Sequence, residues 1–127
     1  MNSRPIRCIA LCLLGTLACS PVGGGRITHV VVVWLKEPGN EAHRRQVIEE
    51  TRKLGAIPGI RSLDVGPCLK SERPIVDSGF DVAITITFDS VADMNAYVRH
   101  PAHEEMVRTK LKPLVSTIRV FDFQSAP

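Results

Sequence analysis

Apolar and polar positions alternate with a period of two in four segments of the chain and follow a helical period in the segments between them. The two-residue period predicts β-strands over residues 27–36, 60–66, 81–88 and 115–123. The helical period predicts helices over residues 41–54, 90–98 and 101–112, the last two forming one helix broken at His100-Pro101. The order βαββαβ predicts an α+β, ferredoxin-like fold, in which an antiparallel sheet carries its helices on one face.

Residues suited to starting helices precede the helical segments. Asn40 is placed to cap the first helix, and Ser90 with Asp93 three residues later forms a capping pair for the second. Pro101 is tolerated in the first turn of the third helix, whereas Pro113 ends it. These residues place the predicted helix boundaries.

The first predicted strand is apolar on both faces. His29, Val31, Val33 and Leu35 alternate with Val30, Val32 and Trp34. Helices packed on one face of the sheet would bury only one of these sets. This pattern therefore predicts that something other than these helices covers the second apolar face of the strand.

The segment from Pro67 to Gly79 contains two prolines, mixed charges and no hydrophobic period. We therefore predict a mobile surface loop here, which could act as a lid.

The N-terminal residues have the composition of an export signal. Arg4 and Arg7 precede an apolar run from Cys8 to Ala18, which is too short to cross a bilayer as a stable helix. The run ends in Thr16-Leu17-Ala18-Cys19, which resembles a lipobox. We predict a signal peptide over residues 1–18, lipidation of Cys19, a flexible tether over 19–25 and a folded domain over 26–124. The mature protein would be exported and anchored to a membrane through its lipid alone, the alternative being a soluble secreted protein.

Charge and cysteine content exclude several classes of protein. Of 16 lysines and arginines, two lie in the predicted signal, so 14 remain against 13 acidic residues, and no basic stripe suggests nucleic-acid binding. Of the four cysteines, only Cys68 lies in the predicted domain, which allows no internal disulfide. We expect Cys68 to be a partly buried free thiol, although pairing between chains remains open. The spacing of Cys and His predicts no metal site.

The segment from Tyr97 to His103 contains the strongest candidates for chemistry. A phenol at Tyr97 and imidazoles at His100 and His103 can exchange protons near neutral pH if the fold directs them into one cavity. His29 lies on an apolar face of the first strand and is a candidate ligand-binding residue. Each has a structural alternative. Tyr97 and His29 can be satisfied core residues, His100 can hydrogen-bond exposed backbone carbonyls at the helix junction, and His103 can have a structural role in the first turn of the next helix.

Several motifs resemble the stress-responsive A/B barrel domain (Dabb) family, within the dimeric α+β barrel superfamily. They are Thr28-His29-Val30-Val31, Ile57-Pro58-Gly59-Ile60, Gly79-Phe80-Asp81-Val82, Phe88-Asp89-Ser90-Val91, Tyr97 to His103 and Lys112-Pro113-Leu114-Val115. The resemblance spans residues 27–123. It implies a homodimeric α+β barrel, in which two sheets face each other, and this would cover the second apolar face of the first strand.

The Tyr-to-His motif is also similar to that of a polyketide cyclase, olivetolic acid cyclase. This resemblance implies that His103 acts as a general base beside a carbonyl group and that Tyr97 stabilises the developing enolate oxygen, with His29 nearby. It implies no cofactor.

Two functional hypotheses follow. The one favoured by the sequence is a homodimeric module that binds a small hydrophobic or carbonyl ligand without catalysis, with His29 and His100 as ligand-binding candidates. The alternative is a cofactor-free lyase or cyclase that uses Tyr97 and His103 for proton transfer.

Overall fold

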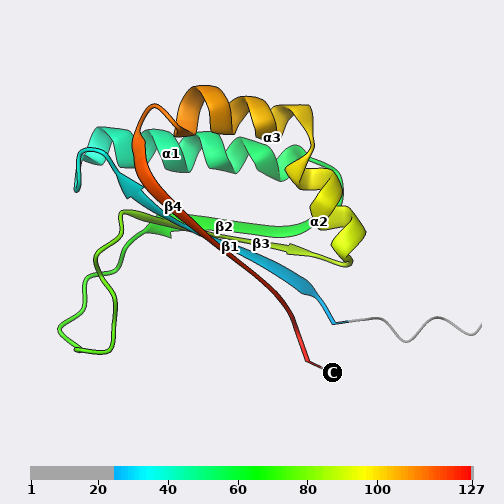
Figure 1. Ribbon diagram of the computed structural model, residues 1–127, viewed down its shortest axis with the longest axis horizontal. Coiled ribbons are helices and arrows are strands. Elements are labelled where there is room, and N and C mark those ends of the chain that lie inside the picture. The colour runs from blue at the N-terminus through cyan, green and yellow to red at the C-terminus, as the bar shows by residue number, and fades with distance from the viewer. Residues whose placement is uncertain (1–24, 127) are drawn as a thin grey trace, which may run out of the picture.

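A computed structural model describes residues 25–126 (Figure 1). The predicted signal peptide and Cys19 lie outside these residues. The elements in chain order are β1 (Ile27–Leu35), α1 (Glu41–Lys53), the 3-10 turn η1 (Leu54–Ala56), β2 (Ile60–Pro67), β3 (Val82–Phe88), α2 (Val91–Val98), α3 (Pro101–Met106), the π-helical turn η2 (Val107–Leu111) and β4 (Val115–Gln124). The predicted βαββαβ order is confirmed.

The four strands form one antiparallel sheet in the order β2-β3-β1-β4. The helices lie together over one face of this sheet (Figure 1). This arrangement is the ferredoxin-like fold. The last strand pairs with β1, so His29 stands opposite Asp122 although 93 residues separate them.

The turn between β1 and α1 depends on one buried carboxylate. Asp81, just before β3, accepts hydrogen bonds from the backbone N–H groups of Leu35 (2.9 Å) and Gly39 (2.8 Å). Gly39 adopts φ 77°, a conformation that side chains disfavour. Asn40 then caps α1, as predicted, by accepting from the His43 N–H at 3.0 Å.

The second helical segment is divided, as the sequence predicts, at His100-Pro101. Ser90 caps α2 through the N–H of Asp93 at 3.1 Å, and Pro101 occupies the first turn of α3. The prediction of one regular helix over 101–112 is only partly right. After Met106 the helix widens into η2, where Lys112 N–H bonds to the Val107 carbonyl five residues back.

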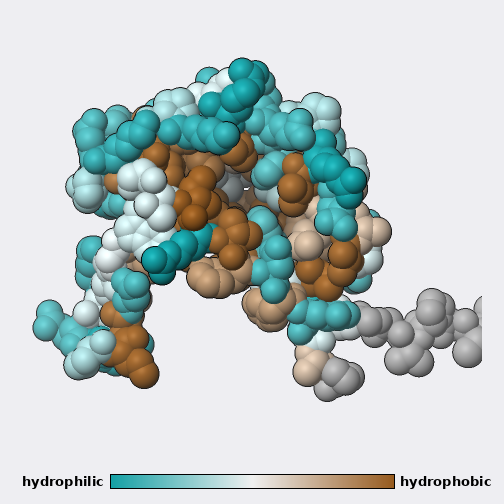
Figure 2. Space-filling view, viewed as in Figure 1, coloured by the Kyte–Doolittle hydropathy of each residue, from teal (hydrophilic) through white to brown (hydrophobic). Residues whose placement is uncertain are grey.

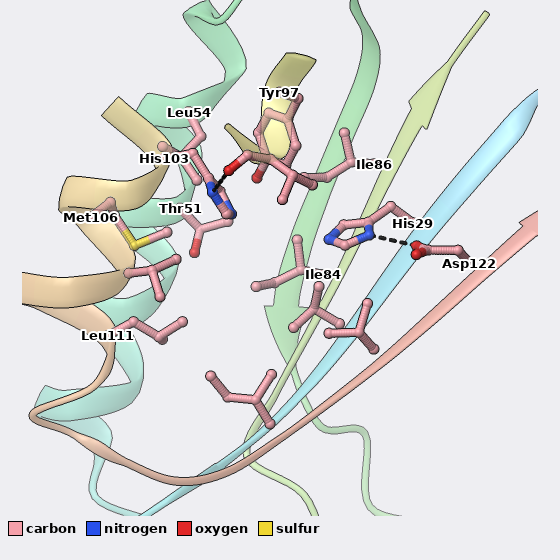
Figure 3. Close-up of a pocket in the computed structure, with 15 residues that line it drawn as sticks. His29, Thr51, Leu54, Ile84, Ile86, Tyr97, His103, Met106, Leu111 and Asp122 are labelled. Atoms are coloured by element: carbon pink, nitrogen blue, oxygen red, sulfur yellow. Dashed lines mark hydrogen bonds and ion pairs between the residues drawn. The ribbon is translucent and has the colours of Figure 1, made fainter. Parts of the chain in front are cut away.

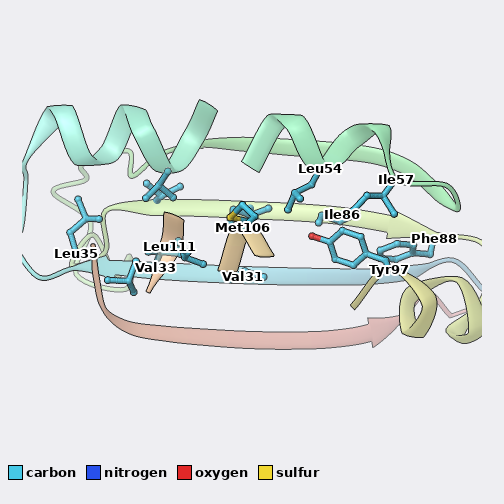
Figure 4. Packing of buried hydrophobic residues seen from close by; sticks show 14 of the residues in the cluster. Val31, Val33, Leu35, Leu54, Ile57, Ile86, Phe88, Tyr97, Met106 and Leu111 are labelled. Atoms are coloured by element: carbon cyan, nitrogen blue, oxygen red, sulfur yellow. The ribbon is translucent and has the colours of Figure 1, made fainter. Parts of the chain in front are cut away.

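The core lies between the helices and the sheet (Figure 4). Side chains from the helix-facing side of β1 and β3 pack there against α1, α2 and η2. The largest fully buried side chains are Phe88, Leu35, Ile86, Val33, Val82 and Thr51. Thr51 is the one polar member of that group.

The strand β4 lies at the edge of the sheet and is poorly covered. Among its helix-facing residues Ile118 and Val120 are 37 % and 49 % exposed. On the opposite face, Phe121 and Phe123 are 55 % and 54 % exposed beside the Val30 and Thr28 of β1. Where β1 and β4 meet, the face away from the helices thus exposes apolar side chains in the single chain.

The loop over residues 68–79 extends from one end of the sheet, on the side away from the helices (Figure 1). Lys70 Nζ donates to the Ser78 carbonyl at 2.7 Å, which joins its two ends. None of its residues lines the pocket described below, so the loop does not lie where a lid would. Within residues 25–126, no helix is both long and apolar enough to cross a membrane.

Candidate functional site

A pocket of about 330 Å³ opens between the helix layer and the sheet. Figure 2 shows the hollow there, bordered by hydrophobic side chains. Its walls are mainly aliphatic, and its polar side chains come from five different elements. The lining residues are His29, Val31, Thr51, Leu54, Ile84, Ile86, Tyr97, Val98, His103, Met106, Val107, Leu111, Ile118, Val120 and Asp122. A small cavity with apolar walls and a few convergent polar groups is the usual form of a ligand site.

Tyr97 is positioned by packing at the end of α2. Its ring lies 5.4 Å from that of Phe88, centroid to centroid, and the side chain is 2 % exposed. Its hydroxyl points toward the interior (Figures 3 and 4). Burial raises the pKa of the Tyr97 phenol above its usual 10. The group therefore remains protonated at neutral pH and can donate a hydrogen bond.

His103 is oriented by the break between α2 and α3. In a continuous helix the Val98 carbonyl would accept from the Ala102 N–H. Here Ala102 N–H donates instead to His100 Nδ1 at 3.2 Å, and the Val98 carbonyl accepts from His103 Nδ1 at 2.9 Å (Figure 3). Because a carbonyl only accepts, His103 carries its proton on Nδ1 when neutral. Its Nε2 then holds a lone pair, which is the form a general base requires.

The environment of His103 favours this neutral form. Burial lowers the pKa of His103 from its usual 6.5 and outweighs the opposing effect of the Val98 hydrogen bond, while the neighbouring His29 adds a lesser lowering. The ring lies 4.7 Å from that of Tyr97, centroid to centroid. A neutral imidazole and a protonated phenol thus share one pocket.

His29 reaches the same pocket from the sheet. Its Nδ1 donates to Asp122 Oδ1 at 2.6 Å across the β1–β4 pair, and its ring meets that of Tyr97 edge to face at 6.1 Å. Only 9 % of the His29 side chain is exposed, against 45 % for Asp122. The carboxylate fixes the ring orientation and directs Nε2 away from β4 (Figure 3).

Three of the four residues that the sequence proposes for chemistry or binding therefore line one pocket: Tyr97, His103 and His29. His100 does not. It caps α3 by accepting from the Ala102 N–H, which is a structural role, although the predicted partners were backbone carbonyls. Cys68, at the start of the loop, is a free and partly exposed cysteine, and it does not line the pocket.

Sequence reasoning missed two polar residues of the pocket, Asp122 and Thr51. Asp122 follows Ile118 and Val120 at alternate positions of the last strand, so a charged residue on an apolar face was a usable signal. Thr51 recurs at helical spacing with Val47, Ile48 and Leu54 in the first helical segment, as a core-facing residue would. Nothing in the sequence distinguishes a pocket-lining threonine from a packed one.

Within residues 25–126, no cluster of three or more His, Cys, Asp or Glu side chains is arranged to hold a metal ion. The arrangement offers a neutral imidazole base, a phenol donor and a carboxylate-oriented imidazole around an apolar cavity. Such a set can take a proton from a bound molecule and stabilise an oxygen on which negative charge develops.

The described residues form one ferredoxin-like domain with a pocket between helices and sheet that contains a phenol and two imidazoles. The family model for the stress responsive A/B barrel domain, Dabb, matches residues 27–125. The chain belongs to the Dabb family, as its motifs predict. No match is found among curated proteins.

Several solved structures share the fold. A Dabb protein from Mesorhizobium loti is 25 % identical, with a TM-score of 0.67 over 81 % of this chain and 99 % of that one. A hydroxynitrile lyase from Passiflora edulis is 22 % identical, with a TM-score of 0.70 over 81 % and 95 % of the two chains. A dimeric protein of unknown function from Bacteroides fragilis is 21 % identical, with a TM-score of 0.66 over 81 % and 99 %.

Proposed function

We propose that this Dabb protein is a cofactor-free enzyme that transfers protons on a small carbonyl compound, with His103 as base and Tyr97 as hydrogen-bond donor. The observation that carries the proposal is the bond from His103 Nδ1 to the Val98 carbonyl, inside a pocket that Tyr97 shares. A histidine serving only the fold would have no need of a cavity in front of its second nitrogen. Of the two hypotheses from the sequence, this geometry favours the alternative.

The step follows from the two groups. His103 Nε2 removes a proton from the carbon next to the carbonyl, and the C–H electron pair forms the C=C bond of an enolate. The carbonyl π pair moves to oxygen, where the Tyr97 hydroxyl donates a hydrogen bond. The enolate carbon is then reprotonated by His103, or attacks a second carbonyl of the same molecule, whose oxygen takes that proton.

The apolar walls set the substrate class. A cavity of about 330 Å³ lies at the small end of the range for ligand sites, about 300–1,000 Å³. Aliphatic side chains surround the polar groups, so we expect a substrate with a hydrocarbon or aromatic body and a carbonyl group. That a protein of this fold from Passiflora edulis is a hydroxynitrile lyase supports acid–base chemistry on the scaffold.

Deuterium exchange tests this function without knowledge of the natural substrate. Phenylacetone, a small aromatic ketone, is incubated with the purified protein in deuterium oxide, and loss of the α-proton signals is followed by NMR. We expect exchange above the buffer rate in the wild type and the buffer rate in His103→Gln. Binding without exchange, seen as shifted protein resonances at an unchanged rate, would instead support the non-catalytic ligand-binding module.

We also propose that the protein is a homodimer in which two sheets face each other. The support is the apolar face away from the helices, which in the single chain exposes Phe121 and Phe123 beside Val30. Trp34 lies on this face under the Arg119 guanidinium, 5.4 Å from its ring centre. Burying such a face would contribute about 25 cal/mol for each Å² of apolar surface. Dimeric relatives of this fold are consistent with it.

Paired substitutions test the dimer. Phe121→Glu places a charge on the proposed interface, whereas Val91→Glu places one at a similarly exposed residue of α2, 53 % exposed, on the helix side. Light scattering over a dilution series is expected to show a dimer for wild type and Val91→Glu, and a monomer or unfolded chain for Phe121→Glu. A wild-type chain that is a folded monomer at every concentration would contradict the dimer.

We further propose that the protein is exported and anchored through a lipid on Cys19. The apolar run from Cys8 to Ala18 and the lipobox-like ending at Cys19 support this. Mass spectrometry of the mature N-terminus is expected to show acylated Cys19, and Cys19→Ser to release the protein from membranes. A cleaved N-terminus without an acyl group would support the soluble secreted form. A chain that still begins at Met1 would contradict export.

A further inference from the structure

Thr51 has a buried hydroxyl group without a hydrogen-bond partner in the part of the chain that the structure describes. The residue is 1 % exposed, and among residues 25–126 no group bonds to its Oγ1. A threonine inside a helix usually satisfies its hydroxyl with the carbonyl four residues back. Thr109 does so in this chain, donating to the Glu105 carbonyl at 2.8 Å. Thr51 does not.

An unpaired buried hydroxyl destabilises the fold, and a valine of the same shape would avoid this. The hydroxyl is also not remote from the chemistry, because Thr51 lines the pocket that contains Tyr97 and His103. Figure 3 shows it on the helix side of the cavity, with His29 and Asp122 on the sheet side. A polar atom of a bound molecule could pair with it, since no protein group does.

We propose that Thr51 is a specificity-determining residue that hydrogen-bonds a second oxygen of the substrate. This inference rests on the proposed function and narrows its substrate class to small carbonyl compounds that carry a further hydroxyl or carbonyl group. The reacting carbonyl lies at Tyr97 and His103, and the second oxygen at Thr51. A site that hydrogen-bonds a substrate hydroxyl discriminates strongly against an analogue without one, because the site group is then left unpaired.

The test compares phenylacetone with its three ring-hydroxylated derivatives, the 2-, 3- and 4-hydroxy isomers. The Kd of each ketone for the wild-type protein is measured by NMR titration. At least one hydroxy isomer is expected to bind about tenfold or more tightly than phenylacetone, as one added hydrogen bond allows. In Thr51→Val this ratio falls to about one, and in Thr51→Ser it is kept. Thr109→Val, which removes a hydroxyl already paired with backbone, leaves the ratio as in the wild type.

A second readout separates ligand recognition from a role in folding. Thr51→Val removes an unsatisfied group, so its Tm is expected to rise by about 4 °C or more without ligand. Thr109→Val breaks an existing bond and should not raise Tm. A fall in Tm for Thr51→Val would show that the hydroxyl serves the fold, and would overturn the inference.

The remaining outcomes separate this inference from the proposed function. If phenylacetone binds and exchanges its α-protons but no hydroxy isomer binds better, or Thr51→Val keeps the preference, the inference fails and the proposed function stands. If none of the four ketones binds the wild type, both fail.

Discussion

His100 and His103 lie three residues apart in one motif, and the structure gives them opposite surroundings. His100 precedes α3 and accepts from the Ala102 N–H, outside the pocket. His103 lies one turn later, donates to the Val98 carbonyl and faces the pocket. By occupying the Ala102 N–H, His100 leaves the Val98 carbonyl for His103. One histidine therefore positions the helix, and the other is free at Nε2 for chemistry.

The difference shows that residue type and spacing do not determine the role of a histidine. What separates the two is the direction in which each ring leaves the break at Pro101, and whether a cavity lies in front of its second nitrogen.

The largest effect is expected for His103→Gln, with His100→Gln as the matched control. Loss of a general base lowers a rate by about 10²–10⁴-fold, so exchange of phenylacetone protons should fall to near the buffer rate. His100→Gln keeps an acceptor near the α3 N-terminus and should exchange at about the wild-type rate. Equal losses in both variants, at matched Tm, would refute the distinction between the two histidines.

Tyr97→Phe should have the next largest effect. Removing one donor to a developing oxyanion costs about 10²–10³-fold in rate. The phenyl ring keeps the packing on Phe88, so the Tm should not fall. Exchange kinetics and thermal unfolding are measured on the same preparation. An unchanged rate would assign Tyr97 to the core alone.

Asp122→Asn should have a smaller effect, because it acts through His29. Hydrogen bonds to charged groups contribute about 1.5–3 kcal/mol, so loss of the carboxylate charge should loosen the His29 ring beside Tyr97 and slow exchange by about ten- to a hundredfold. Glu49→Gln, at an exposed position of α1 outside the pocket, is the control. If both variants exchange as the wild type does, the His29–Asp122 pair has no part in the reaction.

The smallest effect is expected on stability, from His100→Ala. Loss of an N-cap acceptor costs about 0.5–2 kcal/mol, and the long 3.2 Å bond places this residue at the low end. His100→Asn restores a capping side chain and should recover the loss in urea unfolding. If His100→Ala leaves the free energy of unfolding unchanged, the cap does not hold the helix break in place.

The elements of the fold follow from the sequence because each has a local cause. Asn40 and Ser90 cap the two helices that they precede, and the alternation in β1 and β3 sets their buried faces. The exception is the π-helical turn after Met106, for which the sequence carries no such local signal. That is why one regular helix was predicted there.

The site was only partly predictable. The motif gave Tyr97 and His103, and alternation placed His29 on the inner face. Asp122 enters through a strand pairing 93 residues apart, and the unpaired state of Thr51 is visible only once all neighbouring groups are in place. His100 was included because its sequence context is nearly that of His103. Whether each of these residues belongs to the pocket depends on contacts between distant elements, which local sequence patterns do not reveal.

The most direct test of the account is the protonation of His103, followed by nitrogen-15 NMR of the histidine rings across pH. The pKa of His103 should lie below its usual 6.5, because burial disfavours the charged ring. The exchange rate should therefore already be at its plateau at pH 7 and fall as the pH drops through that lowered pKa. We expect a neutral His103 at pH 7 with its proton on Nδ1; a charged ring, or a proton on Nε2, would show that His103 is not the base.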